Sequence, residues 1–242
     1  MSVIAIFGPT GVGKTGVAVA LAELLRERSE DPVAISCDAL QVYEGLATLT
    51  GVASAAERKE LEHRLVGFVP VTERFNVGDY MPLAHAEIDA ALAAGRRPIV
   101  VGGTGLYLRA ALAELSLVKA ESEAPDSELW SPATRHSTTI FGLDMDRAKL
   151  YERIDARTAA IFAAGARKEV ERAEAAGPSR TARVALGFDE VLAGDLATMQ
   201  KRSRNYARRQ LTWMRKIPNL RWIDRTDLSD AEAASRIASH LR

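Results

Sequence analysis

The sequence predicts an α/β fold in which a parallel sheet carries helices on both faces. Two observations lead to this prediction. Short apolar runs of four to six residues alternate with stretches of helical periodicity along most of the chain. The first apolar run, 3–7, ends in a glycine-rich turn that leads directly into a helical stretch. Alternation of this kind is typical of crossover connections, and these join parallel strands.

The individual elements follow from hydrophobic spacing and from boundary residues. Strands are predicted at 3–7, 33–37, 65–69, 98–101, 138–143 and 220–223. Helices are predicted at 13–28, 81–94, from Thr104 onward, 147–164, 199–216, and after Ser229, where Ser-Asp-Ala-Glu forms a capping box. Residues 44–62 and 187–196 have weak or mixed periodicity. We expect residues 1–242 to form a single domain.

Composition narrows the class of protein. The 242 residues include 32 basic and 32 acidic side chains, so a uniformly basic nucleic-acid binder is excluded, although a local basic patch is not. A single cysteine excludes a scaffold built on internal disulfides. The apolar runs, such as 16–22, are too short to cross a bilayer, and the N-terminus lacks the basic start of a signal peptide. We therefore expect a cytoplasmic protein without membrane contact.

The turn after the first strand matches the G-x-x-x-x-G-K-[ST] phosphate-loop pattern completely and lies between a strand and a helix. Such a loop turns backbone N–H groups toward phosphate oxygens, and the helix N-terminus adds partial positive charge. Lys14 is expected to reach terminal phosphates and Thr15 to offer its hydroxyl to Mg²⁺. The diphosphate-binding residues are Gly8, Thr10, Gly11, Val12, Gly13, Lys14 and Thr15. The alternative is a turn that only joins strand to helix; the pattern favours a P-loop NTPase-like sheet.

A carboxylate is expected near the phosphates. The strand 98–101 ends in Gly-Gly-Thr-Gly without the acid that P-loop ATPases place there, whereas Asp38 directly follows the strand 33–37. Both strand ends should face the same crevice in a parallel sheet. Asp38 then acts on a substrate near the phosphates, as a general base or through a metal-bound water, or alternatively it caps a helix or turn. Thr104 either hydrogen-bonds the substrate or is a plain helix N-cap.

Several segments together resemble the tRNA dimethylallyltransferases. They are 8–15, 36–43, 75–80, 101–108, 150–155, 183–188 and 206–213, in this order. The resemblance covers nearly the whole chain apart from 44–60 and 116–135.

The resemblance implies a specific chemistry. The phosphate loop would hold dimethylallyl diphosphate with Mg²⁺ on Thr15, and the exocyclic amine of an adenine would attack the allylic carbon. Asp38 would accept the amine proton. Lys14, Mg²⁺ and an arginine, Arg183, would stabilise the leaving diphosphate, and Thr104 would complete the catalytic set. The residues implied to contact the substrate RNA are Asp38, Ala39, Leu40, Gln41, Thr104, Arg204 and Arg208.

The sequence departs from this family in two places. The family's Asp-Ser-x-Gln, often with arginine at the open position, is Asp38-Ala39-Leu40-Gln41 here, so a hydroxyl and a positive charge are missing. The helical insert that helps members to grip the anticodon arm is replaced at 116–135 by a short, loop-like connection. We therefore expect a reduced helical accessory region and better support for the prenyl-transfer core than for the tRNA substrate.

A basic run without acidic residues occupies 201–216. Arg204 and Arg208 lie one helical turn apart in it, and aromatic side chains are interleaved. This pattern is typical either of a solvated helix face or of contact with RNA or diphosphate. The four histidines lack metal-ligand spacing, and Cys37 is expected in the core.

These observations predict a monomeric, Mg²⁺-dependent prenyltransferase that modifies an adenine next to the anticodon of tRNA. Three alternatives remain open at this point. The acceptor could be a free adenine nucleotide. The chain could instead be a small-molecule P-loop kinase with Arg180 and Arg183 as lid residues. It could also be a phosphate- and RNA-binding module that has lost catalysis through Ala39 and Leu40.

Overall fold

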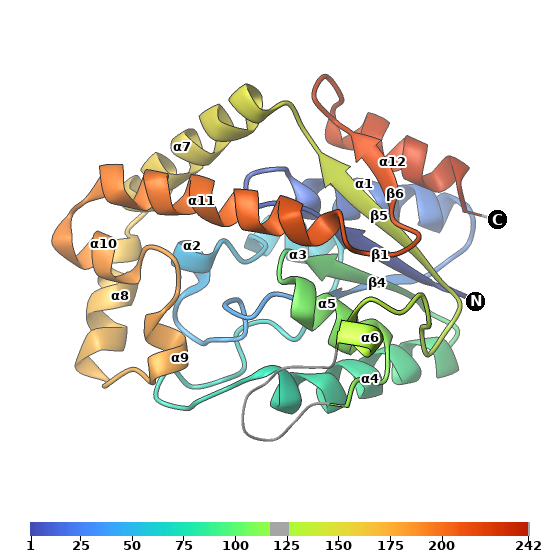
Figure 1. The fold of residues 1–242 in the computed structure, drawn as a ribbon, viewed down its shortest axis with the longest axis horizontal. Coiled ribbons are helices and arrows are strands. Elements are labelled where there is room, and N and C mark those ends of the chain that lie inside the picture. The colour runs from blue at the N-terminus through green and yellow to red at the C-terminus, as the bar shows by residue number, and fades with distance from the viewer. Residues whose placement is uncertain (117–125, 242) are drawn as a thin grey trace.

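A six-stranded parallel sheet forms the centre of the molecule (Figure 1). The structure is a computed structural model that describes residues 1–116 and 126–241. The strands are β1 Val3–Phe7, β2 Pro32–Ser36, β3 His63–Arg64, β4 Arg97–Gly102, β5 Thr138–Asp144 and β6 Arg221–Asp224. They lie in the order β3-β2-β4-β1-β5-β6, and every pair is parallel. The predicted fold class is therefore confirmed.

Helices cover both faces of the sheet and continue beyond it. They are α1 Lys14–Glu27, α2 Ala47–Thr50, α3 Ala55–Glu60, α4 Val77–Ala93, α5 Gly105–Leu112, α6 Asp126–Leu129, α7 Arg147–Ala163, α8 Ala166–Ala175, α9 Arg180–Arg183, α10 Phe188–Ala193, α11 Leu196–Met214 and α12 Asp230–Ser239. One apolar cluster joins α1 and α12 to the sheet, and another joins α4 and α5 to the opposite face. These two clusters fix the three-layer arrangement.

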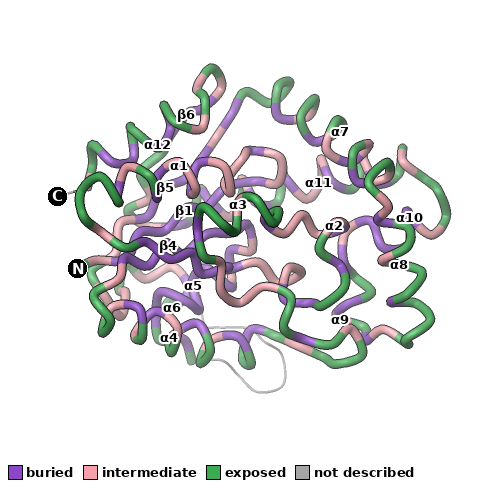
Figure 2. Tube along the Cα trace, turned by 180° about the vertical axis from the view of Figure 1, so that it is seen from behind, coloured by how far each residue is buried: buried purple, intermediate pink, exposed green. Residues whose placement is uncertain are grey.

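A third apolar cluster lies outside the sheet, where α8, α9 and α10 pack together with α2. Tyr43, Phe188 and Val170 are at its centre and are almost completely buried. Figure 1 shows this helical group at the end of α11 that is far from the sheet. Figure 2 shows that buried residues continue from the sheet into this group. Long α7 and α11 connect this group to the sheet, so it stands beside the carboxyl ends of the strands.

The predicted strand at 65–69 is wrong. The chain pairs only over His63–Arg64, because Leu65 adopts a left-handed backbone conformation with φ of 58° that ends the strand. A single bridge between Tyr43 and Val69 is all that remains of the expected pairing.

Helix boundaries differ from the predicted ones where caps decide them. Helix α4 begins four residues before the predicted position, because Asn76 and Asp79 form a capping box. The capping box at Ser229 is present as predicted. Of the predicted connection 116–135, residues 117–125 lie outside the described residues, and the remainder contains only the single turn of α6. Within the described ranges, no helix has the length and apolarity needed to span a membrane.

Candidate active site

The loop after β1 has the conformation that its glycines make possible. Gly11 and Gly13 have φ of 82° and 89°, in the left-handed region that side-chain-bearing residues rarely adopt. A Cβ on Gly8 would lie 2.9 Å from the carbonyl oxygen of Leu143, so this position also requires glycine. Val12 is completely buried, so its side chain packs in the core and does not reach the cavity. The loop is therefore a shaped cradle, as the sequence predicts.

Lys14 folds over this cradle. Its Nζ donates hydrogen bonds to the carbonyl oxygens of Gly8 at 2.9 Å and Pro9 at 3.0 Å. Burial lowers the pKa of Lys14 to about 8, while the nearby Asp38 carboxylate opposes this shift. A cation held without a direct carboxylate partner is well suited to bind an incoming phosphate oxygen.

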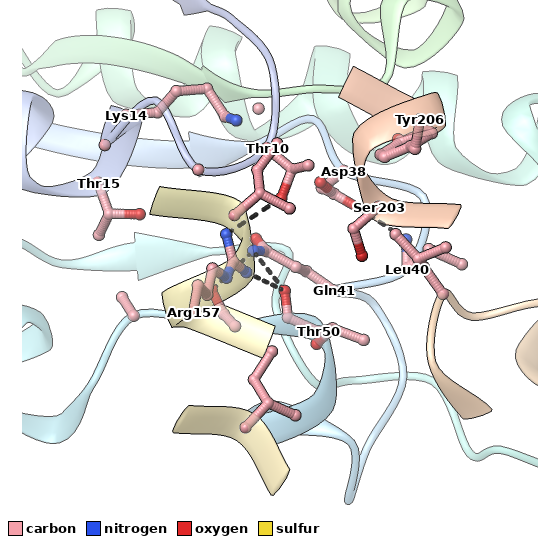
Figure 3. Close-up of a pocket in the computed structure, with 18 of the residues that line it drawn as sticks. Thr10, Lys14, Thr15, Asp38, Leu40, Gln41, Thr50, Arg157, Ser203 and Tyr206 are labelled. Carbon is pink, nitrogen blue, oxygen red and sulfur yellow. Dashed lines mark hydrogen bonds between the residues drawn. The ribbon is translucent and has the colours of Figure 1, made fainter. Parts of the chain in front are cut away.

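A cavity of about 320 Å³ opens in front of the loop. Its polar wall includes Thr10, Lys14, Thr15, Asp38 and Gln41 (Figure 3). The apolar wall of the same cavity is formed by Leu40, Leu49, Ile161, Leu186 and Met199. The phosphate loop and Asp38 thus meet at one cavity, as their positions after parallel strands predict.

Asp38 and Thr104 are connected by the turn after β2. The Oδ1 atom of Asp38 accepts a hydrogen bond from the backbone N–H of Leu40 at 3.0 Å, so this residue caps the turn and also lines the cavity. Thr104 occupies the N-cap position of α5, but its Oγ1 accepts from the N–H of Ala39 at 3.2 Å and caps no helical N–H. Tyr206 also lines the cavity, and burial raises its pKa. The bond between Thr104 and Ala39 therefore stabilises the turn that carries Asp38.

The turn that carries Asp38 is fixed by Gln41. The Gln41 side chain accepts a hydrogen bond from the Ser36 hydroxyl at 3.2 Å and donates to the Gly51 carbonyl at 3.1 Å. These bonds join β2 to the segment after α2, and the Gln41 side chain still borders the cavity. Gln41 can consequently contact a substrate and hold Asp38 in place.

Two arginines of α7 reach the phosphate loop, and sequence reasoning missed both. Arg153 donates from Nε to the Gly11 carbonyl at 2.9 Å. Arg157 donates to the Thr10 hydroxyl and to the Thr50 carbonyl, each at 3.3 Å (Figure 3). Burial lowers the pKa of Arg157, and Asp38 counters this effect. Their spacing of four residues puts both on one helix face, which is the signal that could have identified them.

Gln210 of α11 is the other residue that was not predicted. Its Oε1 accepts a hydrogen bond from the backbone N–H of Thr10 at 2.8 Å, and its Nε2 donates to the Gly103 carbonyl at 2.8 Å. The loops after β1 and β4 are thereby tied together through one buried side chain. The basic helix thus contributes to the site through a neutral residue.

The three arginines predicted as site residues lie outside this cavity. Arg183 is ion-paired with Glu174 and, at 3.2 Å, with Asp189 on the helical group beyond the sheet. Arg204 pairs with Asp155 at 2.5 Å, and Arg208 is exposed beside Asn205. Arg153 and Arg157 contact the loop where a contact by Arg183 was predicted. Cys37 is a buried core residue, as expected.

Two protein-family models match this chain. The family model described as IPP transferase matches residues 41–135 and 119–217, which together exceed half of the chain. The chain belongs to the IPP transferase family. A second model, described as isopentenyl transferase, matches residues 1–67. Family membership favours a prenyl-transferring enzyme over the kinase and binding-only alternatives.

Curated relatives agree with this assignment. The chain is 35% identical to a tRNA dimethylallyltransferase of Rhodospirillum centenum, with 97% of this chain and 95% of the relative covered. It is 32% identical to the tRNA dimethylallyltransferase of Thermobifida fusca, with 95% and 92% covered. The first alignment extends over 303 positions, more than the 242 residues of this chain, so that relative has residues without a counterpart here.

Solved structures match over almost the whole fold. The tRNA isopentenylpyrophosphate transferase of Bacillus halodurans superposes with a TM-score of 0.81 at 27% identity, covering 98% of this chain and 96% of that one. The corresponding protein of Staphylococcus epidermidis superposes with a TM-score of 0.82, covering 98% and 97%, and at 22% identity supports the fold alone.

Proposed function

We propose that this chain transfers the dimethylallyl group of dimethylallyl diphosphate to the exocyclic amine of an adenine in tRNA, next to the anticodon. The observation that carries the proposal is the shared cavity, which is lined by the phosphate loop, by Asp38 and by an apolar wall. A diphosphate needs the cradle, a five-carbon chain suits the apolar wall, and an attacking amine needs a base. The relatives named tRNA dimethylallyltransferase support the same reaction.

In the proposed reaction the amine nitrogen forms a bond to the first allylic carbon, and the bond from that carbon to the diphosphate oxygen breaks. Asp38 accepts the proton that the amine releases. Lys14 and Arg157 stabilise the negative charge that develops on the leaving diphosphate, because both cations border the loop. Arg183 remains a predicted contributor, although its carboxylate partners hold it elsewhere.

Mg²⁺ fits the residues at the loop as a cofactor shared with the donor. The Thr15 hydroxyl lines the cavity, and in the described part of the chain no group of three or more His, Cys, Asp or Glu side chains could hold a metal ion alone. Magnesium is commonly held by one or two protein oxygens together with substrate phosphates. Thr15 would hold the ion, which would supply charge neutralisation of the diphosphate when bound.

The tRNA acceptor is supported more by the relatives than by the accessory region. The two matched pieces of the family model overlap at 119–135, where we predict that the helical insert of the family is replaced by a short connection. An acceptor without an anticodon arm, such as adenosine monophosphate, is the alternative that this shortening favours. We further propose that the protein is a cytoplasmic monomer, as the sequence analysis predicts.

Labelled dimethylallyl diphosphate, incubated with the protein, Mg²⁺ and either total tRNA or adenosine monophosphate, tests the proposal. We expect label in tRNA and release of diphosphate. Label in the mononucleotide alone would show that the acceptor is the free nucleotide and not tRNA. No label in either acceptor, together with ATP turnover in a separate assay, would refute prenyl transfer.

A further inference from the structure

The most unusual charged group outside the cavity is Arg109 on α5. Its side chain is completely buried. The Nη2 atom donates to the backbone carbonyls of Ser131 at 2.9 Å and of Glu128 and Ala133 at 3.4 Å. Its Nε and Nη1 atoms are buried and have no hydrogen-bond partner. Over residues 1–116 and 126–241, no carboxylate forms an ion pair with Arg109.

A guanidinium group stays protonated in proteins, so Arg109 is a buried cation without a counter-charge. Burial lowers the pKa of Arg109, and no neighbouring charge offsets this effect. An unpaired buried charge is strongly unfavourable, and chains that retain one usually supply a partner. The three carbonyl groups satisfy one nitrogen only. The missing partner must therefore come from outside the described chain or from solution.

A separate cavity of about 130 Å³ lies against Arg109. Its lining includes Thr138, Asn219 and Arg221, and the last two are exposed at its edge. The hydroxyls of Thr134 and Thr138 both donate to the His136 carbonyl at 2.8 Å, so they have no proton left for a ligand. The donors that line the cavity are consequently the guanidinium groups of Arg109 and Arg221, the Asn219 carboxamide and the Thr139 hydroxyl. Arg221 also donates one long bond, at 3.5 Å, to the His240 carbonyl.

This cavity is distinct from the active site. It lies where β5 and β6 begin, because Thr138 starts β5 and Arg221 starts β6. Thr138 pairs with Val3 at the start of β1, whereas the phosphate loop follows the end of β1. The sheet is parallel, so the strand starts that border this cavity and the strand ends that border the active site lie at opposite ends of the sheet, whose strands Figure 1 shows. The prenyl-transfer reaction does not require this second cavity.

We propose that this second cavity binds an oxyanion of the phosphate class between Arg109 and Arg221. Arginine forks match the oxygens of phosphate, and a site rich in donors without a carboxylate selects an anion. The same chemistry has two sources, free phosphate or a phosphate of bound RNA. The exposed Arg215 and Lys216 near this end of α11 add positive charge close to Asn219.

The experiment uses the full chain with Lys14→Ala, which weakens phosphate binding at the active site. Equilibrium dialysis with radiolabelled inorganic phosphate at constant ionic strength measures the remaining binding. We expect binding to persist, and to weaken roughly tenfold when Arg221→Ala is added, the effect of one charged hydrogen bond. Asn219→Gly, which suits the backbone φ of 57°, should weaken it about threefold. Arg167→Ala, an exposed residue of α8, is the matched control.

Arg109→Met should abolish the binding. Where this variant fails to fold, the two exposed positions decide the result, because their replacement leaves the core intact. Absence of phosphate binding in Lys14→Ala, or binding that neither Arg221→Ala nor Asn219→Gly changes, would overturn the proposal and assign the cavity to water. Displacement of labelled phosphate by a tRNA stem–loop identifies an RNA phosphate as the source, and absence of displacement identifies free phosphate.

Discussion

Asp38→Asn separates the base from the turn cap, because asparagine can keep one role and not the other. The Leu40 N–H bonds Oδ1 of Asp38 at 3.0 Å, and the amide oxygen of asparagine can accept the same bond. The turn after β2 is also held by Gln41, so the fold should be unchanged. An amide cannot accept the amine proton at neutral pH. We therefore expect kcat to fall by roughly 10²–10⁴-fold, the usual contribution of a positioned general base.

The same substitution affects Lys14 through its charge. Asp38 raises the pKa of Lys14 against the lowering effect of burial, which leaves it at about 8. Loss of the carboxylate should lower this pKa further, so Lys14 in the variant loses its proton at a lower pH. Donor affinity of the ligand-free variant should therefore decline at lower pH than in the unmodified protein. Assays at several pH values separate the two effects, because the loss of the base persists while the effect on Lys14 fades as the pH falls.

Single-turnover transfer of labelled dimethylallyl groups to a tRNA stem–loop, with both substrates saturating, is the appropriate assay. Asp195→Asn is the matched control, because Asp195 caps α11 by the same kind of bond and lies outside the cavity. If the single-turnover rate of Asp38→Asn stays within about threefold of the unmodified protein while the KM from steady-state kinetics rises, the proton acceptor is another group and Asp38 only binds substrate.

Three further substitutions test the remaining parts of the site. Arg157→Met should lower kcat/KM by roughly 10²-fold, because a cation beside the leaving diphosphate is lost. Steady-state kinetics measures kcat/KM, and an unchanged value would contradict the role assigned to Arg157. Lys14→Met should abolish donor binding yet raise the unfolding temperature of the ligand-free protein by about 2–4 °C below pH 8, because the lowered folded-state pKa makes the protonated lysine destabilising there. This gain in unfolding temperature should shrink between pH 8 and 10.5, and calorimetry at both pH values checks it. Arg208→Ala should reduce the slope of log K for tRNA binding against log salt concentration by about 0.9. Arg204→Ala should change this slope little, because Asp155 already neutralises Arg204. Equal slopes for Arg208→Ala and the unmodified protein would remove α11 from the RNA interface.

Local sequence signals predict much of this architecture because they act over short distances. The phosphate loop is readable since its glycines, Lys14 and the following helix are contiguous, and the structure has Gly11 and Gly13 in the conformations that the pattern requires. The position of Asp38 is predictable from one rule, that parallel strands end at the same edge. The strand at 65–69 fails for a local reason too, because no residue pattern announces the left-handed turn at Leu65.

The second half of the site could not be derived in this way, because its residues come from helices whose docking depends on distant contacts. Arg157 and Gln210 lie on α7 and α11, more than a hundred residues after the loop that both of them bond. Helical periodicity indicates which face of α11 is buried but does not say which segment packs against that face. The basic residues of 201–216 therefore suggested an RNA interface, whereas in the structure the neutral Gln210 of the same helix bonds the phosphate loop. The charged residues on the same helix are partly engaged elsewhere, as Arg204 is with Asp155. A chain with no net charge can therefore keep uncompensated cations where phosphates are expected, and the electrostatics of the site depend on which arginines have carboxylate partners.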